Sequence, residues 1–181
     1  MPLPKDQTYT IEDIYALPDG QRAELIDGQL YMMTPPNRRH QELVVELSSA
    51  ILQHIRRKNG SCKVYPAPFA VFLNADDKTY VEPDISVICD RNKLDDRGCK
   101  GAPDWIIEIV SPSSRRMDYR SKHNLYGDAG VREYWIVDPE KERVTVYHYE
   151  EDDAPTIFLF TQPIPVGTFE GFQVTVADLR R

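Results

Sequence analysis

The chain has 181 residues, of which 41% are apolar and 28% are charged, and its formal net charge is −7. This balance is typical of a soluble globular protein, and we expect one domain over residues 1–181. The negative charge excludes a polycation, so a nucleic-acid partner would need a local basic patch. There is no apolar run of about 18 residues and no apolar core of a signal peptide, so we expect a cytoplasmic protein without membrane contact.

Three cysteines, Cys62, Cys89 and Cys99, show no spacing typical of a metal site. An odd number without a pattern favours reduced thiols over a disulfide framework. We therefore expect free thiols, as in an intracellular protein.

The first third of the sequence combines helix signals with a hairpin signal. Residues 10–17 predict a short helix, and residues 23–33 predict a β-hairpin that turns at Asp27 and Gly28. A long amphipathic helix follows over residues 38–58, because its apolar residues recur at helical spacing. We therefore expect an N-terminal helix-hairpin-helix region.

Strands dominate the middle of the chain. The predicted segments are residues 63–73, 80–89, 104–111 and 132–139. Between the last two lies a helix that is expected to start after Pro112 and to stop near Gly130. A nearly continuous apolar strand, a helix and a second apolar strand are typical of a βαβ crossover with parallel strands.

The last third predicts further strands, which we expect to be antiparallel. They span residues 143–150, 156–161 and 173–179, and the acidic residues 150–154 predict a solvated loop. The whole pattern predicts an α/β protein, with a central mixed sheet flanked by helices and a C-terminal antiparallel extension.

Glu108 is the residue that most needs an explanation. It lies inside the apolar segment WIIEIV, where an unpaired carboxylate would be costly to bury. A second carboxylate, Asp84, lies between apolar neighbours in VEPDISVI. On neighbouring strands, the two carboxylates could share a divalent cation such as Mg²⁺ or Mn²⁺, which prefers oxygen ligands. The carbonyl group of Ile109 could add one more ligand.

The helix that follows Glu108 is basic. It carries Arg115, Arg116, Arg120 and Lys122 against one aspartate, Asp118, which shares a helix face with Lys122 and is a candidate supporting residue. The three arginines are candidates for contact with nucleic-acid phosphates. A metal ion polarises a phosphate and lowers the pKa of bound water, and a nearby lysine neutralises developing charge. These are the parts that phosphodiester hydrolysis requires.

Each of these residues also has an ordinary structural interpretation. Asp84 could simply follow a proline at a strand edge, and Lys122 could be a solvated helix residue. Glu108 could be neutralised by a structural arginine from the following helix. Arg115 and Arg116 fit a solvated helix face as well as a phosphate clamp, and the sequence leaves both interpretations open.

The run from Glu24 to Pro139 resembles the PD-(D/E)XK nuclease superfamily, and in particular the Uma-type restriction endonuclease family. The matching segments are ELIDG, PDISVI and EIVSPSSRRMDYRSKHNLYGDAGVREYWIVDP. The lysine that the superfamily usually carries two residues after the acid is replaced here by Val110. The resemblance implies that this lysine has moved to the following helix, at Lys122, whose long side chain can reach the sheet.

The resemblance implies a restriction-endonuclease-like fold and a Mg²⁺- or Mn²⁺-dependent endonuclease that hydrolyses DNA. It assigns Asp84 and Glu108 as metal ligands and Lys122 as the catalytic base or an electrostatic helper. Glu24 and His40 match the family's N-terminal acidic and histidine positions and are expected to be supporting residues. Such nucleases often act in pairs, so the resemblance also implies a homodimer.

Two other functions stay open at this point. Val110 at the usual lysine position fits a catalytically degenerate module that binds nucleic acid or protein. A small-molecule phosphatase could use the same metal chemistry, but in a deep closed pocket rather than an open basic groove. His40 lies on the apolar face of its helix, where a lone histidine also fits a hydrogen-bonded core residue.

Overall fold

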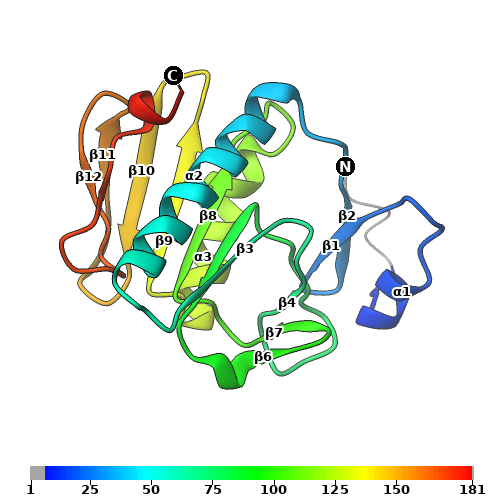
Figure 1. Cartoon of the computed structure of the whole chain (residues 1–181). Coiled ribbons are helices and arrows are strands. Elements are labelled where there is room, and N and C mark those ends of the chain that lie inside the picture. The colour runs from blue at the N-terminus through cyan, green and yellow to red at the C-terminus, as the bar shows by residue number, and fades with distance from the viewer. Residues whose placement is uncertain (1–6, 181) are drawn as a thin grey trace.

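A mixed six-stranded sheet forms the centre of the computed structural model, which describes residues 7–180 (Figure 1). Its strands are β3 (Lys63–Pro66), β5 (Ile85–Ile88), β8 (Trp105–Ile109), β9 (Glu133–Asp138), β10 (Arg143–His148) and β11 (Asp152–Leu159). They are ordered β11-β10-β9-β8-β5-β3 across the sheet. β8 and β9 pair in parallel, whereas each other neighbouring pair is antiparallel. The expectation of an α/β protein with a central mixed sheet is therefore confirmed.

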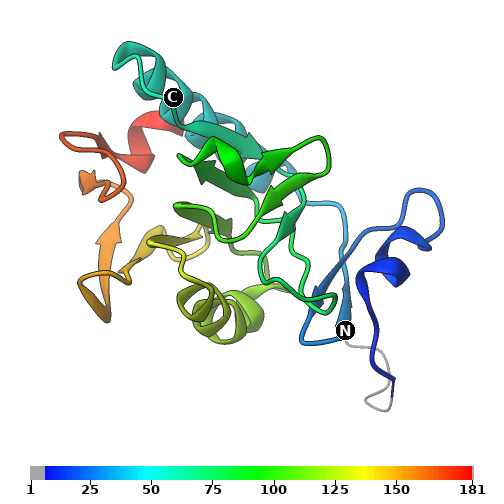
Figure 2. The same ribbon diagram turned by 90° about the horizontal axis from the view of Figure 1, so that it is seen from below.

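Helices cover both faces of this sheet (Figures 1 and 2). The covering elements are α2 (Arg38–Arg57), the π-helical segment η2 (Met117–Ser121) and α3 (Lys122–Ala129). Trp105 and Ile107 of β8 share a core cluster with α2, whereas Ile106 and Val110 share the opposite cluster with Tyr126 of α3. Because side chains alternate along a strand, this pattern directs Glu108 toward η2 and α3.

The predicted βαβ crossover is confirmed, because β8 and β9 are parallel and are joined through η2 and α3. The helix ends at Gly130, whose φ of 91° is left-handed and suits glycine. The helical segment differs from the expectation in one respect. Its π-helical turn, η2, widens the backbone immediately before Lys122, and such turns are frequent at functional sites.

The N-terminal residues place a helix and a hairpin beside a small three-stranded sheet (Figure 1). The elements are α1 (Ile11–Tyr15), β1 (Ala23–Ile26), β2 (Gln29–Met32), β4 (Val71–Phe72), η1 (Arg91–Lys93), β6 (Leu94–Asp95) and β7 (Gly98–Lys100). Leu25 and Tyr80 exchange two backbone hydrogen bonds, at 2.7 and 2.8 Å. These bonds fasten β1 to the segment that leads into β5.

Prolines shorten two of the predicted strands. The segment 63–73 splits into β3 and β4, with a cis peptide bond between Ala67 and Pro68. The segment 80–89 forms a regular strand only from Ile85, because Pro83 has no backbone N–H to donate. Asp84 therefore lies at the entrance of β5 rather than inside the strand.

The C-terminal elements are shorter than expected. They are β12 (Ile164–Pro165), β13 (Gln173–Val174) and the 3₁₀ helix η3 (Val176–Arg180). The predicted strand over 173–179 is wrong beyond Val174, because the chain turns there to bury Val176 in the core under α2. The predicted loop over 150–154 is also too long, since β11 begins at Asp152.

The expectation of free thiols is wrong for two of the three cysteines. Cys62 and Cys89 form a disulfide, and Cys99 is free and buried. The register of the sheet explains this pairing, because β3 and β5 are antiparallel with Lys63 opposite Ile88. The flanking cysteines are thereby brought opposite each other. In the part of the chain that the structure describes, no helix has the length and apolar character needed to cross a membrane.

Candidate active site

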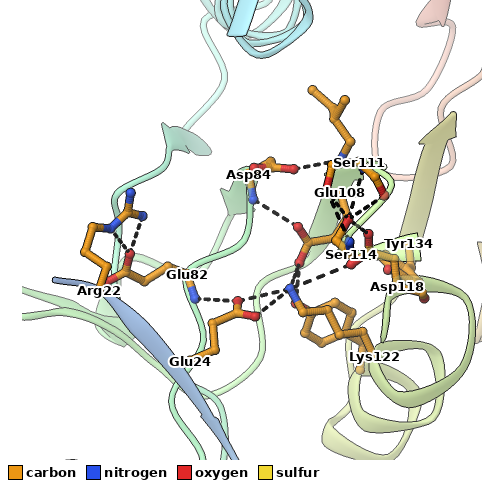
Figure 3. Close-up of polar contacts among 12 residues, drawn as sticks. Arg22, Glu24, Glu82, Asp84, Glu108, Ser111, Ser114, Asp118, Lys122 and Tyr134 are labelled. Atoms are coloured by element: carbon orange, nitrogen blue, oxygen red, sulfur yellow. Dashed lines mark hydrogen bonds and ion pairs between the residues drawn. The ribbon is translucent and has the colours of Figure 1, made fainter. Parts of the chain in front are cut away.

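Glu108 lies buried on the face of the sheet that η2 and α3 cover (Figure 3). Its Oε1 accepts hydrogen bonds from Lys122 Nζ at 2.8 Å and from Tyr126 OH at 2.7 Å. Its Oε2 accepts from the backbone N–H of Asp84 at 3.3 Å. A lysine, rather than an arginine of the helix, therefore compensates the buried carboxylate.

Asp84 lies beside Glu108 at the entrance of β5, the antiparallel neighbour of β8 (Figure 3). Its Oδ2 accepts a hydrogen bond from the backbone N–H of Ile109 at 2.7 Å and lies 3.1 Å from His40 Nε2. Its Oδ1 accepts no hydrogen bond from any of residues 7–180, and the side chain is 16% exposed. This oxygen is therefore open to solvent and to a ligand.

Lys122 is the centre of a buried charge cluster (Figure 3). Its Nζ lies 2.8 Å from Glu108 Oε1, 2.8 Å from Glu24 Oε2 and 3.9 Å from Asp118 Oδ1. Glu24 comes from β1, and its Oε1 also accepts the backbone N–H of Glu82 at 3.1 Å. The cluster therefore joins β1, β8 and the helix of the crossover through one ammonium group.

Asp118 is held by the serine turn that follows β8. Its Oδ2 accepts a hydrogen bond from Ser114 Oγ at 2.6 Å, and its backbone carbonyl accepts from Tyr134 OH at 3.1 Å. Ser114 Oγ in turn accepts the backbone N–H of Ser111 at 3.0 Å. The turn and η2 thus fix Asp118, one helical turn before Lys122.

Burial and mutual charge shift the titration of the cluster. Burial raises the pKa of Glu108 well above its ordinary value, although the charge of Lys122 opposes the shift. Burial would lower the pKa of Lys122, but Glu108, Glu24 and Asp118 outweigh it and raise that pKa well above its ordinary value. Burial also raises the pKa of Asp118 to about 6 against the opposing charge of Lys122. Lys122 is therefore a cation at neutral pH.

His40 reaches Asp84 from the first turn of α2. That helix is capped by Asn37, whose Oδ1 accepts the backbone N–H of His40 at 2.9 Å. Burial would lower the pKa of His40, but the hydrogen bond and the charge of Asp84 outweigh it and raise that pKa. His40 Nδ1 is buried and has no hydrogen-bond partner among the described residues. The histidine is thus hydrogen-bonded and adjacent to the carboxylate pair.

The three arginines of the basic run separate in the structure. Arg115 forms ion pairs with the buried Asp138 and, at 2.8 Å, with Glu140. The hydrogen bond and charge of Asp138 raise the pKa of Arg115. Arg116 and Arg120 are exposed to solvent. Asp84, Glu108 and Lys122 therefore come together with Glu24, His40 and Asp118, whereas the arginines lie outside this cluster.

Two contributors to the cluster were not evident from the sequence. Glu82 looks like an ordinary residue before a proline, yet it is 8% exposed and donates its N–H to Glu24. Ser114 looks like part of a polar turn, yet it binds Asp118. An acid next to the PD pair was the available signal for Glu82. The sequence carried no comparable signal for Ser114.

The oxygen atoms of Asp84 and Glu108 have the chemistry of a Mg²⁺ or Mn²⁺ site. Among residues 7–180, no three His, Cys, Asp or Glu side chains are grouped so that they could hold a metal ion by themselves. Mg²⁺ is often bound by one or two carboxylates, with water and phosphate oxygens completing the shell. The open Oδ1 of Asp84 and the single long hydrogen bond to Glu108 Oε2 leave capacity for such a cation.

The fold matches that of a solved nuclease-like protein. Its description is "putative nuclease belonging to DUF820", from Anabaena variabilis. The two chains superpose with a TM-score of 0.76 and 22% identity, and the match covers 94% of this chain and 96% of the other. An uncharacterized protein from Synechocystis sp. is 26% identical over 133 residues, which are 73% of this chain and 68% of the relative.

Residues 11–177 match the Uma2 family, which is described as "Putative restriction endonuclease". The match spans most of the chain, so the chain belongs to this family. The resemblance found on the PD and EIVSPSS segments is thereby confirmed.

Proposed function

We propose that the chain is a metal-dependent endonuclease that hydrolyses phosphodiester bonds in DNA. The main support is the meeting of Asp84, Glu108 and Lys122, which are separated in the sequence but come together over the neighbouring strands β5 and β8. The description of the Uma2 family and the nuclease description of the solved relative agree with this proposal. Val110 packs in the core cluster that contains Tyr126 of α3, and Lys122 is the lysine that reaches Glu108.

Asp84 and Glu108 would hold the cation, with Mg²⁺ or Mn²⁺ as the proposed cofactor. Asp84 Oδ1 and Glu108 Oε2 are the oxygens with free capacity, and the carbonyl group of Ile109 is the proposed third ligand. When bound, the ion supplies a Lewis acid for the phosphate and lowers the pKa of a bound water.

Lys122 acts in this proposal as an electrostatic helper rather than as a general base. Its raised pKa keeps the ammonium group protonated near neutral pH, and a protonated amine cannot accept a proton. The cation instead opposes the effect of burial on Glu108 and adds positive charge near the scissile phosphate. Tyr126 fixes the same Glu108 oxygen from the next turn of the helix.

Arg116 and Arg120 are the proposed contacts with the DNA backbone, because both are exposed on the helix of the crossover. Arg115 forms ion pairs with Asp138 and Glu140, and its proposed role is to fix the start of that helix. A homodimer is proposed as the form that cuts both strands. Light scattering at working concentration should give about twice the 20.9 kDa of one chain, and a monomer would remove this part of the proposal.

The experiment is a plasmid nicking assay with purified protein and Mg²⁺ or Mn²⁺. Cleavage should require the cation and should disappear in Asp84→Asn and Glu108→Gln, both of which keep side-chain size. Arg132→Gln is the matched control, because Arg132 forms a half-exposed ion pair with Asp104 away from the site. Cleavage that survives in both site variants, or a protein that binds DNA without cutting it, would reject the nuclease assignment.

A further inference from the structure

An ion pair beside the candidate site has no evident part in the chemistry. Arg22, which directly precedes β1, donates from Nε to Glu82 Oε2 at 2.8 Å, and its Nη2 contacts the same oxygen (Figure 3). The Arg22 side chain is 39% exposed, whereas that of Glu82 is 10% exposed. The Oε1 of Glu82 accepts a hydrogen bond from Tyr80 OH at 2.7 Å. The Glu82 carboxylate is therefore fixed at both oxygens.

The position of this carboxylate matters because the backbone of the same residue serves the charge cluster. The N–H of Glu82 donates to Glu24 Oε1 at 3.1 Å, and Glu24 binds Lys122 Nζ. A shift of residue 82 would therefore move the acceptor that holds one side of the ammonium group. Asp84 lies two residues further on, so the same shift would reach the carboxylate pair.

Arg22 and Glu24 hold residue 82 together. Arg22 directly precedes β1 and Glu24 lies in it, and both side chains reach residue 82 (Figure 3). One side chain binds the carboxylate of Glu82, and the other binds its backbone N–H. Together with the backbone bonds between Leu25 and Tyr80, these contacts clamp the segment before β5 onto the hairpin.

We propose that Arg22 and Glu82 are a positioning pair, which fixes the backbone N–H that holds Glu24 and, through Glu24, the ammonium group of Lys122. The pair does not touch the reacting atoms. Its importance for catalysis rests on the proposed nuclease function, whereas its effect on Lys122 does not. Loss of Arg22 leaves the Glu82 carboxylate without its cation, and we expect the segment around residue 82 to shift.

The test compares Arg22→Gln with Arg132→Gln in the full chain. The control arginine has a similar exposure, since the side chains of Arg132 and Asp104 are 45% and 14% exposed, and it also pairs with the exposed Glu150 at 3.0 Å. The first readout is the rate at which an amine-acylating reagent labels Lys122 at pH 8, followed by mass spectrometry. Labelling should rise about fivefold or more in Arg22→Gln and stay at the wild-type rate in Arg132→Gln. Arg22→Lys, which keeps the charge, should return labelling most of the way to wild type.

The second readout is steady-state cleavage of a DNA oligonucleotide. Arg22→Gln should lower kcat by about tenfold or more, with little change in KM, as is common for residues that orient active-site groups. Equal labelling of Lys122 in the Gln variants of Arg22 and Arg132 would overturn the inference. If the wild-type protein cuts no DNA, the labelling result still decides the positioning role, and only the nuclease proposal fails.

Discussion

Lys122 Nζ lies 2.8 Å from Glu24 Oε2 and 2.8 Å from Glu108 Oε1, so one cation ties the N-terminal hairpin to the central strand of the fold. In the sequence, Lys122 lies 98 positions after Glu24 and 14 positions after Glu108. A buried cation between two carboxylates is stable only while the geometry and the hydrogen bonds are kept. The cluster is therefore expected to control stability as well as activity.

Replacement of Lys122 by methionine should destabilise the protein strongly. It leaves Glu24, Glu108 and Asp118 buried without their cation, and breaking a buried pair in this way costs about 3–5 kcal/mol. The remaining carboxylates would then take up protons, so the loss should be larger at pH 8 than at pH 5. Urea unfolding at both pH values measures this loss of unfolding free energy. A loss that is small or independent of pH would contradict the assigned cluster.

Replacement of Asp118 by asparagine should change how stability depends on pH. The pKa of Asp118 is about 6 in the folded protein, against an ordinary value of 3.8. An acid whose pKa is raised on folding favours the folded state below pH 4, and this contribution is lost as the pH rises toward 6. Between pH 4 and pH 7, the free energy of unfolding of Asp118→Asn should therefore rise by up to about 3 kcal/mol relative to that of the wild type. Parallel pH profiles for the two proteins would count against the shift.

Replacement of Tyr126 by phenylalanine removes one hydrogen bond from Glu108 Oε1 and nothing else. The expected loss is about 1–3 kcal/mol of unfolding free energy, because a buried charged acceptor loses a donor. Tyr65→Phe is the control, since the Tyr65 hydroxyl has no hydrogen-bond partner in residues 7–180. Thermal melts of the two variants should differ clearly, and equal melts would mean that Tyr126 does not support Glu108.

The disulfide between Cys62 and Cys89 predicts a redox-dependent stability. The bridge spans a sequence separation of 27 residues, and a closed loop of this length is worth about 3.5 kcal/mol through the unfolded state. Reduction with a dithiol, or Cys62→Ser, should lower the melting temperature, and added reductant should not lower that of Cys62→Ser further. Cys99→Ser keeps the bridge and should respond to reductant as the wild type does. Mass spectrometry without reduction would reveal the bridge directly. Three free thiols in the purified protein would refute it.

The sequence predicts the strands and the helix around this site better than the contacts between its side chains. The nearly continuous apolar run WIIEIV, the helix after Pro112 and the apolar segment 132–139 are enough to place β8, the crossover and β9. The resemblance, rather than any local pattern, points to Lys122, since a sequence separation of 14 hides its contact with Glu108. The π-helical turn η2 was not predicted from the sequence.

Contacts that join distant segments are the least predictable part. The backbone N–H of Glu82 binds Glu24 only after β1 has paired with the segment before β5, and no local preference encodes that pairing. The disulfide depends in the same way on the register of β3 against β5. Pro83 accounts for one difference, since the predicted strand 80–89 runs through it whereas β5 begins at Ile85.

The central claim is that Asp84 and Glu108 together bind a divalent cation. The most direct measurement is a calorimetric titration of Mn²⁺ into wild-type protein, Asp84→Asn, Glu108→Gln and the control Arg132→Gln. We predict one Mn²⁺ per chain in the wild type and the control, and loss of this binding in both site variants. Equal binding in all four proteins, or no binding to the wild type, would contradict the claim.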